Sequence, residues 1–160
     1  MKGYRIALCV AIAVACVFAL AAAAFADDHF SGAWRVNLAK STYSPGLPPK
    51  SMTSTITVTG DTMSFTFDGY DGDGKALLLE ELSVKVDGKD YPVKGDPIRD
   101  TTAMKKIDDY TLEQVNKKDG KVTTITRTVY NPDGKSRIAT TTGTDAQGRK
   151  INNIVFSDKR

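Results

Sequence analysis

Four Asp-Gly-Lys tripeptides are the first candidates for chemistry in this sequence. They begin at Asp73, Asp87, Asp119 and Asp133. The first copy lies in residues 68–75, a stretch with the aspartates and glycines of a calcium-binding loop. An EF-hand loop that started at Asp71 would need an oxygen ligand at its fifth position and glycine at its sixth, where the chain has Lys75 and Ala76. A start at Asp68 fails as well, so we expect no metal site. Because Asp-Gly supplies the positive φ angles of tight turns, we interpret the tripeptides as punctuation between strands.

Residues for nucleophilic or acid–base catalysis are scarce. The single histidine, His29, lies near the expected start of the mature protein, and Cys9 and Cys16 lie in the first 26 residues. Ser-His and Cys-His pairs are therefore excluded, as are zinc sites built on His or Cys. Glu80 and Glu81 are adjacent, so on a strand they point to opposite faces. A carboxylate pair from distant strands stays open, but we expect no enzymatic activity and no cofactor.

Arg127 is the sharpest single candidate for a ligand contact. It has the same parity as Ile125 and Val129, so it faces the interior of a sheet structure if they do. A buried arginine needs an internal carboxylate or an anionic ligand as its partner. In the alternative, the inward residues are Thr126, Thr128 and Tyr130. Arg127 would then be solvated, as most arginines are.

The sequence predicts β-strands almost throughout, and these strands must position the candidate residues. β-branched Thr recurs along it, and Thr fits a pleated surface better than a helix. Apolar and polar residues alternate with a period of two, which indicates strands with one buried face. The predicted strands are residues 31–37, 51–59, 62–69, 76–86, 89–94, 100–107, 110–117, 121–130, 135–143 and 149–157. We predict an all-β fold, in which an antiparallel up-and-down meander of about nine or ten strands closes into a single barrel with almost no helix.

The apolar parity of these strands predicts the lining of the barrel. The expected inward residues are Ile56, Val58, Met63, Phe65, Phe67, Leu82 and Val84. The inward face of a small barrel either packs shut or lines a cavity for one ligand. If there is a cavity, these residues predict an apolar ligand, and Arg127 is the only internal cation that we expect for an anionic head.

The first 26 residues predict a secretory signal peptide. A basic start precedes the apolar run 6–24, and Ala24 and Ala26 form a small-x-small cleavage site. Cleavage after Ala26 would leave one domain, residues 27–160, which has no cysteine and so no disulfide. We expect export to the periplasm or the cell exterior. The alternatives are a retained membrane anchor and a lipoprotein modified at Cys16.

The charge balance of the expected mature chain argues against a nucleic-acid partner. Loss of Lys2 and Arg5 leaves 20 basic and 19 acidic residues. No cluster of Lys and Arg marks a binding face for phosphates. After cleavage we expect no stable membrane span either, and a small molecule is the expected partner.

The start of the expected mature chain, Phe30-Ser-Gly32-Ala-Trp34, opens a long meander and resembles the calycins, which include lipocalins and fatty-acid-binding proteins. Gly32 and Trp34 match the Gly-x-Trp pattern of those families, and Phe30 matches more weakly. The resemblance implies structural roles for Gly32 and Trp34, with Trp34 plugging one end of a barrel that holds an apolar ligand. Two features depart from it. The Arg-x-Tyr clamp of the last strand in fatty-acid-binding proteins is absent from residues 154–156, and a Pro-rich loop replaces their helical lid.

Two functional hypotheses follow. In the first, the protein is an exported barrel that binds a small apolar or amphipathic molecule. In the second, it is a closed, ligand-free barrel that acts through its surface as an envelope or protein-interaction component. An interior cavity of about 300 Å³ or more would favour the first, whereas large side chains filling the middle would favour the second.

Overall fold

The computed structural model describes residues 28–77 and 82–160. The predicted signal peptide, residues 1–26, and the pair Glu80 and Glu81 lie outside these ranges. Ten strands make up most of the described chain. They are β1 (Gly32–Val36), β2 (Ser51–Thr59), β3 (Thr62–Tyr70), β4 (Leu82–Lys85), β5 (Asp87–Pro92), β6 (Thr101–Asp108), β7 (Thr111–Lys118), β8 (Lys121–Tyr130), β9 (Ser136–Thr144) and β10 (Lys150–Lys159). A short 3-10 turn, η1 (Leu38–Lys40), follows β1.

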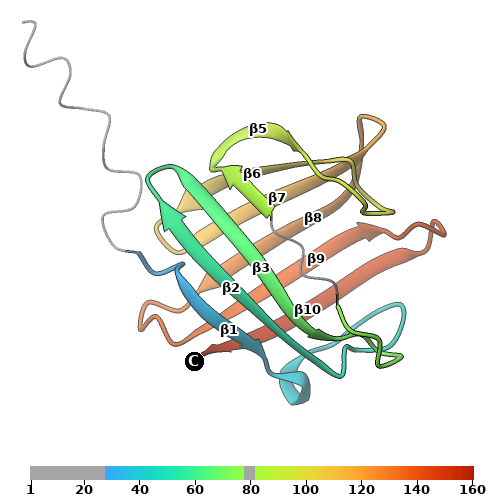
Figure 1. Cartoon of the computed structure of the whole chain (residues 1–160), viewed down its shortest axis with the longest axis horizontal. Coiled ribbons are helices and arrows are strands. Elements are labelled where there is room, and N and C mark those ends of the chain that lie inside the picture. The colour runs from blue at the N-terminus through green and yellow to red at the C-terminus, as the bar shows by residue number, and fades with distance from the viewer. Residues whose placement is uncertain (1–27, 78–81) are drawn as a thin grey trace, which may run out of the picture.

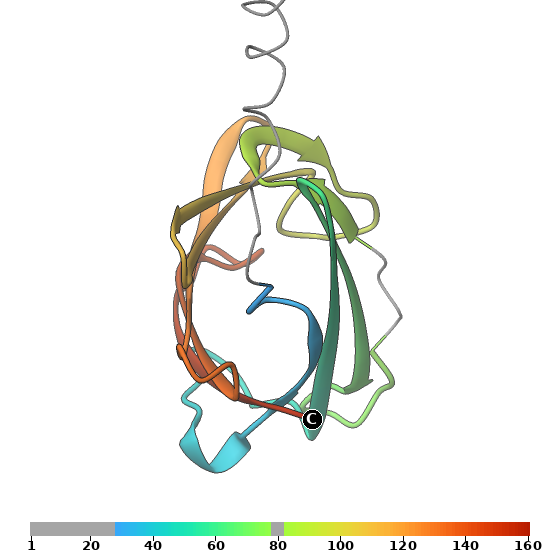
Figure 2. The same ribbon diagram turned by 90° about the vertical axis from the view of Figure 1, so that its left-hand side faces the viewer.

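The strands form one antiparallel sheet in the order β4-β3-β2-β1-β10-β9-β8-β7-β6-β5. Strand β1 joins the two ends of the meander, since Trp34 lies opposite Lys159 of β10 and Ser54 of β2. The sheet curls until its edge strands, β4 and β5, approach each other (Figure 1). Turned by 90°, the molecule shows the ring of a nearly closed barrel (Figure 2). The predicted all-β meander is therefore confirmed.

The Asp-Gly-Lys copies differ in what they connect. Gly74, Gly88, Gly120 and Gly134 all have positive φ, as predicted. At the β7–β8 turn both Asp119 (φ 50°) and Gly120 (φ 72°) are left-handed, which suits a two-residue hairpin. The prediction of a hairpin is wrong for the second copy, because β4 and β5 do not pair and Gly88 instead lies at a register shift between β5 and β6.

The predicted strand 76–86 is confirmed for residues 82–85, which form β4. Among the described residues, the ladder between β3 and β4 runs from Leu82 to Lys85, and an isolated bridge joins Tyr70 to Ala76. Residues 78–81 lie outside the described ranges. In the turn after β3, Asp71 accepts backbone hydrogen bonds from Asp73 (3.1 Å) and Lys75 (2.8 Å), and just beyond it the Leu77 N–H donates to the Gly69 carbonyl of β3 at 3.0 Å.

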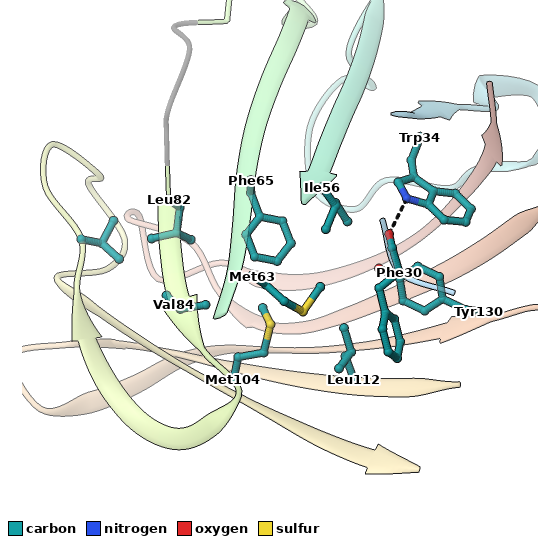
Figure 3. Close-up of a cluster of buried hydrophobic side chains, with 11 residues drawn as sticks. Phe30, Trp34, Ile56, Met63, Phe65, Leu82, Val84, Met104, Leu112 and Tyr130 are labelled. Carbon is teal, nitrogen blue, oxygen red and sulfur yellow. Dashed lines mark hydrogen bonds between the residues drawn. The ribbon is translucent and has the colours of Figure 1, made fainter. Parts of the chain in front are cut away.

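An aromatic plug closes one end of the barrel. Phe30, Trp34 and Tyr130 are almost fully buried. The indole Nε1–H of Trp34 donates to the carbonyl of Phe30 at 2.9 Å, and the Tyr130 ring stands edge-on to both neighbours at centroid distances of 4.8 and 5.2 Å (Figure 3). Gly32 has φ +133°, a conformation that residues with a Cβ rarely adopt, and it is covered by the side chain of Lys159, whose Nζ lies over the Trp34 ring. This packing gives a physical reason for glycine two residues before the tryptophan.

Neither a membrane-spanning helix nor a metal-binding cluster is found in the described part of the chain. Within residues 28–77 and 82–160, no helix has the length and apolar character needed to cross a membrane. Within the same ranges, no group of three or more His, Cys, Asp or Glu side chains is arranged to hold a metal ion.

Candidate ligand-binding site

A cavity of about 250 Å³ lies inside the barrel, beyond the aromatic plug. Its apolar lining side chains come from β2, β3, β4, β6 and β7. They are Met52, Phe65, Phe67, Leu82, Met104 and Leu112. The remaining lining of β7–β10 is largely polar. Its side chains are Gln114, Thr126, Thr128, Ala139, Thr141, Val155 and Ser157. The volume falls short of the roughly 300 Å³ that was expected for the binding hypothesis, although the interior is not filled by side chains either, so a bound molecule would have to be smaller than drug-sized.

The predicted inward residues of β2, β3 and β4 do face the interior, but they divide into two groups. Phe65, Phe67 and Leu82 line the cavity. The others do not line it and belong to the hydrophobic core cluster. They are Ile56, Val58, Met63 and Val84. In Figure 3, Met63 lies between the plug and Phe65. Ligand contact therefore stays a prediction for the first group, and the second group belongs to the hydrophobic core.

The inward placement of Arg127 is wrong. Its side chain is on the outer face of β8 together with Ile125 (41% exposed) and Val129 (45% exposed). The reason is Tyr130, which must face inward to complete the plug. Strand residues alternate between faces, so an inward Tyr130 also turns Thr128 and Thr126 inward and leaves Arg127 outside. The alternative interpretation of this strand was the correct one.

The internal cation that sequence reasoning missed is Arg137. It lies on β9 directly opposite Tyr130 of β8 and Ser157 of β10. Its Nη1 donates to the Tyr130 hydroxyl at 3.0 Å and its Nη2 to the Ser54 hydroxyl at 2.5 Å. The guanidinium carbon lies 5.0 Å from the Trp34 ring centroid and 5.6 Å from that of Tyr130, within the range of a cation–π contact. Arg137 thus links the plug to the cavity.

A second arginine lines the cavity toward the opposite end of the strands. Arg99 precedes β6, and its Nη1 is 3.5 Å from the side-chain oxygen of Asn116 on β7. Its Nε forms an ion pair with Asp96 at 2.7 Å, and both side chains are mostly buried. The positive charge of Arg99 is therefore balanced by a neighbouring carboxylate.

The phenol of Tyr130 is held in its neutral form. Burial raises the pKa of Tyr130, and the nearby Arg137 guanidinium only partly opposes this effect. The neutral phenol can accept a hydrogen bond from Arg137 and still donate its own proton. The end of the cavity near the plug therefore combines one guanidinium with two hydroxyl groups.

Comparison with known proteins identifies the fold. No protein-family model and no curated protein matches the sequence. Among solved structures, a Schistosoma mansoni fatty acid binding protein in complex with arachidonic acid matches with a TM-score of 0.58 and 17% identity, over 83% of this chain and 97% of that one. Zebrafish ileal bile acid-binding protein complexed with cholic acid matches with a TM-score of 0.52 and 16% identity, over 82% of this chain and 98% of that one. At such identities the likeness concerns the fold alone, and by fold this chain is a calycin-like, nearly closed ten-stranded barrel.

Proposed function

We propose that this protein is an exported binding protein that holds one small apolar or amphipathic molecule inside its barrel. The observation that carries the proposal is the internal cavity of about 250 Å³. A barrel that acted only through its surface would have its interior filled by side chains, since protein cores are close-packed. The two similar structures hold arachidonic acid and cholic acid, which supports an apolar or amphipathic ligand here.

Binding suits the cavity better than catalysis. Among the described residues that line it, none is Asp, Glu or His. These are the side chains that most often act as general acids and bases, and Tyr130, the lining residue that could also do so, has its pKa raised by burial and stays neutral. We therefore propose that the ligand leaves the barrel unchanged.

Binding can be tested with a cavity-filling variant. Octanol, a probe small enough for the cavity, is titrated by calorimetry into the wild-type protein and into Ala139→Phe, whose new ring would occupy the cavity. The control is Ala33→Phe on β1, where the side chain points away from the interior because its neighbour Trp34 points inward. We expect saturable binding by the wild type and the control, and none by Ala139→Phe. Native mass spectrometry of protein purified from its own host would show whether a molecule co-purifies. If the probe does not bind to the wild type and no molecule co-purifies, the closed-barrel hypothesis is favoured.

Export is a separate part of the proposal. Ala24 and Ala26 supply the small residues that signal peptidase requires, so the mature protein should begin at Asp27. Intact-mass measurement of protein recovered from the cell envelope tests this start. A mass that retained Cys16 with added acyl chains would show that the lipoprotein pathway is used instead.

A further inference from the structure

The outer face of β8, β9 and β10 is apolar at several positions that face solvent. Among the described residues, nine large apolar side chains are exposed, and five of them lie on these three strands. They are Val122, Ile125, Val129, Ile138 and Ile154, each between 38% and 54% exposed. The outer face of β2 carries Thr55, Thr57 and Thr59 instead. Because a contiguous exposed apolar patch on a protein usually marks an interaction site, this face is a candidate contact with another molecule.

The register of the sheet joins these side chains into one patch. Val129 of β8 lies opposite Ile138 of β9, and Ile125 of β8 lies opposite Val115 of β7. A hollow of about 550 Å³, open to solvent, lies between Ile125, Val129 and Ile138. Ile107 on the next strand, β6, is 42% exposed as well. The patch therefore extends over four adjacent strands, β6 to β9.

Opposite charges lie side by side in the middle of this patch. Arg127 of β8 is directly opposite Glu113 of β7, and both border the hollow. Glu113 forms an ion pair with Lys105 of β6 at 2.8 Å. Among the described residues, no carboxylate forms an ion pair with Arg127. A face that carries an acid next to a base is complementary to a copy of itself turned by 180°.

A twofold axis parallel to the strands, midway between β7 and β8, makes this complementarity concrete. It places β8 of one copy over β7 of a second copy, and β9 over β6. Arg127 then faces the second copy's Glu113, and Ile125 faces its Val115. Ile138 comes toward the second copy's β6, where Ile107 is exposed. Each contact occurs twice, as in any interface with twofold symmetry.

The area of this face is sufficient for a weak dimer. Its four strands are 8, 8, 10 and 9 residues long. At about 3.3 Å per residue and about 4.8 Å between strands, the face measures roughly 500 Å² in each copy. Two copies would bury about 1,000 Å², which is near the smallest area of a specific interface. We therefore expect a dissociation constant of about 10–100 µM, so that a solution of about 1 µM contains the monomer with this face exposed.

We propose that the outer face of β6–β9 is the interface of a weak homodimer, in which Arg127 of each copy pairs with Glu113 of the other. This surface lies outside the barrel, so the proposal goes beyond the proposed function and does not depend on a ligand in the cavity.

Sedimentation velocity of protein recovered from the cell envelope tests the proposal. Between about 1 and 500 µM, the wild type should pass from monomer to dimer by mass action. Ile138→Asp would place an unpaired charge inside the contact, so this variant should stay monomeric over the whole range. The matched control is Thr57→Asp on the outer face of β2, which should dimerise as the wild type does.

An exchange of charges tests the ion pair itself. Arg127→Glu and Glu113→Arg each set like charges against one another across the axis, so each should weaken dimerisation at least about tenfold. In an equimolar mixture of these two variants, both pairs again join opposite charges. The mixture should form a heterodimer with about the affinity of the wild type, which also shows that both variants are folded.

The other outcomes contradict the proposal. A wild type that remains monomeric at the highest concentration overturns it, and co-sedimentation with phosphatidylglycerol vesicles, lost in Ile138→Asp, would then assign this face to a lipid surface. A dimer that persists in Ile138→Asp uses a different face. A mixture of Arg127→Glu and Glu113→Arg that does not associate would exclude the proposed ion pair.

Discussion

The two halves of this barrel use opposite patterning to build one interior. In β2 and β3, apolar side chains such as Ile56 and Phe65 face inward, and the threonines of β2 face solvent. In β8 the threonines at 124, 126 and 128 face inward, as does Thr141 of β9, whereas Ile125 and Ile138 lie on the outside with about 40% of their surface exposed. The same alternation of Thr with β-branched apolar residues thus serves both orientations. Alternation predicts a strand, but it does not say which face is buried.

The inverted half is tolerated because its inward polar groups bond to one another. Thr126 and Thr141 share a hydrogen bond of 2.8 Å between their hydroxyls. The amide of Asn116 donates to Thr124 at 2.9 Å in the same manner. Buried polar groups cost little when they are paired in this way. The cavity is therefore lined by apolar side chains of β2–β4 and by several hydroxyl groups of β8–β10.

The largest predicted difference in stability is between two Ile→Ala variants, one in each half of the barrel. Ile56→Ala in β2 removes a side chain that is 2% exposed and should lower the free energy of unfolding by about 2–5 kcal/mol. Ile125→Ala in β8 makes the same chemical change on the outer face and should cost less than about 1 kcal/mol. Urea denaturation of both variants measures the difference. Equal losses would mean that the outer face of β8 is covered in solution.

Each half of the barrel contains a strand glycine with the same strained backbone conformation, although the two halves bury opposite residue types. Gly69 of β3 and Gly143 of β9 both have φ near +148°, and a Cβ at either would lie about 2 Å from a carbonyl oxygen of the neighbouring strand. Gly→Ala at each should destabilise by about 1–3 kcal/mol. Gly134 in the β8–β9 turn has φ +68° and open space around it, so Gly134→Ala should cost only about 1 kcal/mol. Thermal unfolding would rank the three variants, and a turn variant that cost more than both strand variants would contradict this account.

The strands could be predicted because they depend on neighbouring residues in the sequence. The lining of the cavity could not, because it depends on contacts between residues far apart in the sequence. The strands could be placed from period-two alternation and from turn residues, because both act within a few residues of one another. The connection between β4 and β5 was wrongly predicted as a hairpin, because these two strands do not pair. The inward face of β8, however, is decided by Tyr130 packing on Phe30 and Trp34, which are about a hundred residues away.

Arg127 and Arg137 show the consequence for the candidate site. Both are arginines on strands of alternating Thr and apolar residues, and only one faces the cavity. The register that pairs Arg137 with Tyr130 settles the question, and it is a property of the assembled sheet. The apolar part of the lining was accessible from the sequence because β2 and β3 keep the ordinary pattern of a half-buried strand.

A smaller effect is expected among the polar side chains of the lining. Thr126→Val alone leaves the hydroxyl of Thr141 without its partner and should cost about 1 kcal/mol of unfolding free energy. The double variant Thr126→Val with Thr141→Val removes both hydroxyls and keeps their shape, so it should be close to the wild type. A double-mutant cycle of urea denaturation measures the coupling. Additive losses from the two changes would show that the hydroxyls do not depend on each other.

Calcium is expected to leave the melting temperature of the protein unchanged. The Asp71 carboxylate in the first Asp-Gly-Lys region accepts two backbone hydrogen bonds within its own turn, and Asp133 in the fourth copy accepts one from Lys135 at 2.8 Å. These oxygens close turns, so they are not arranged around a common point as calcium ligands would be. A ligand that binds only the folded state raises the melting temperature, so calcium in millimolar excess should leave it unchanged relative to magnesium at the same ionic strength. A rise of several degrees with calcium alone would overturn the interpretation of the turn at residues 71–75. The loss of that rise in Asp71→Asn, but not in Asp133→Asn, would then locate the ion in the half of the barrel that contains β3.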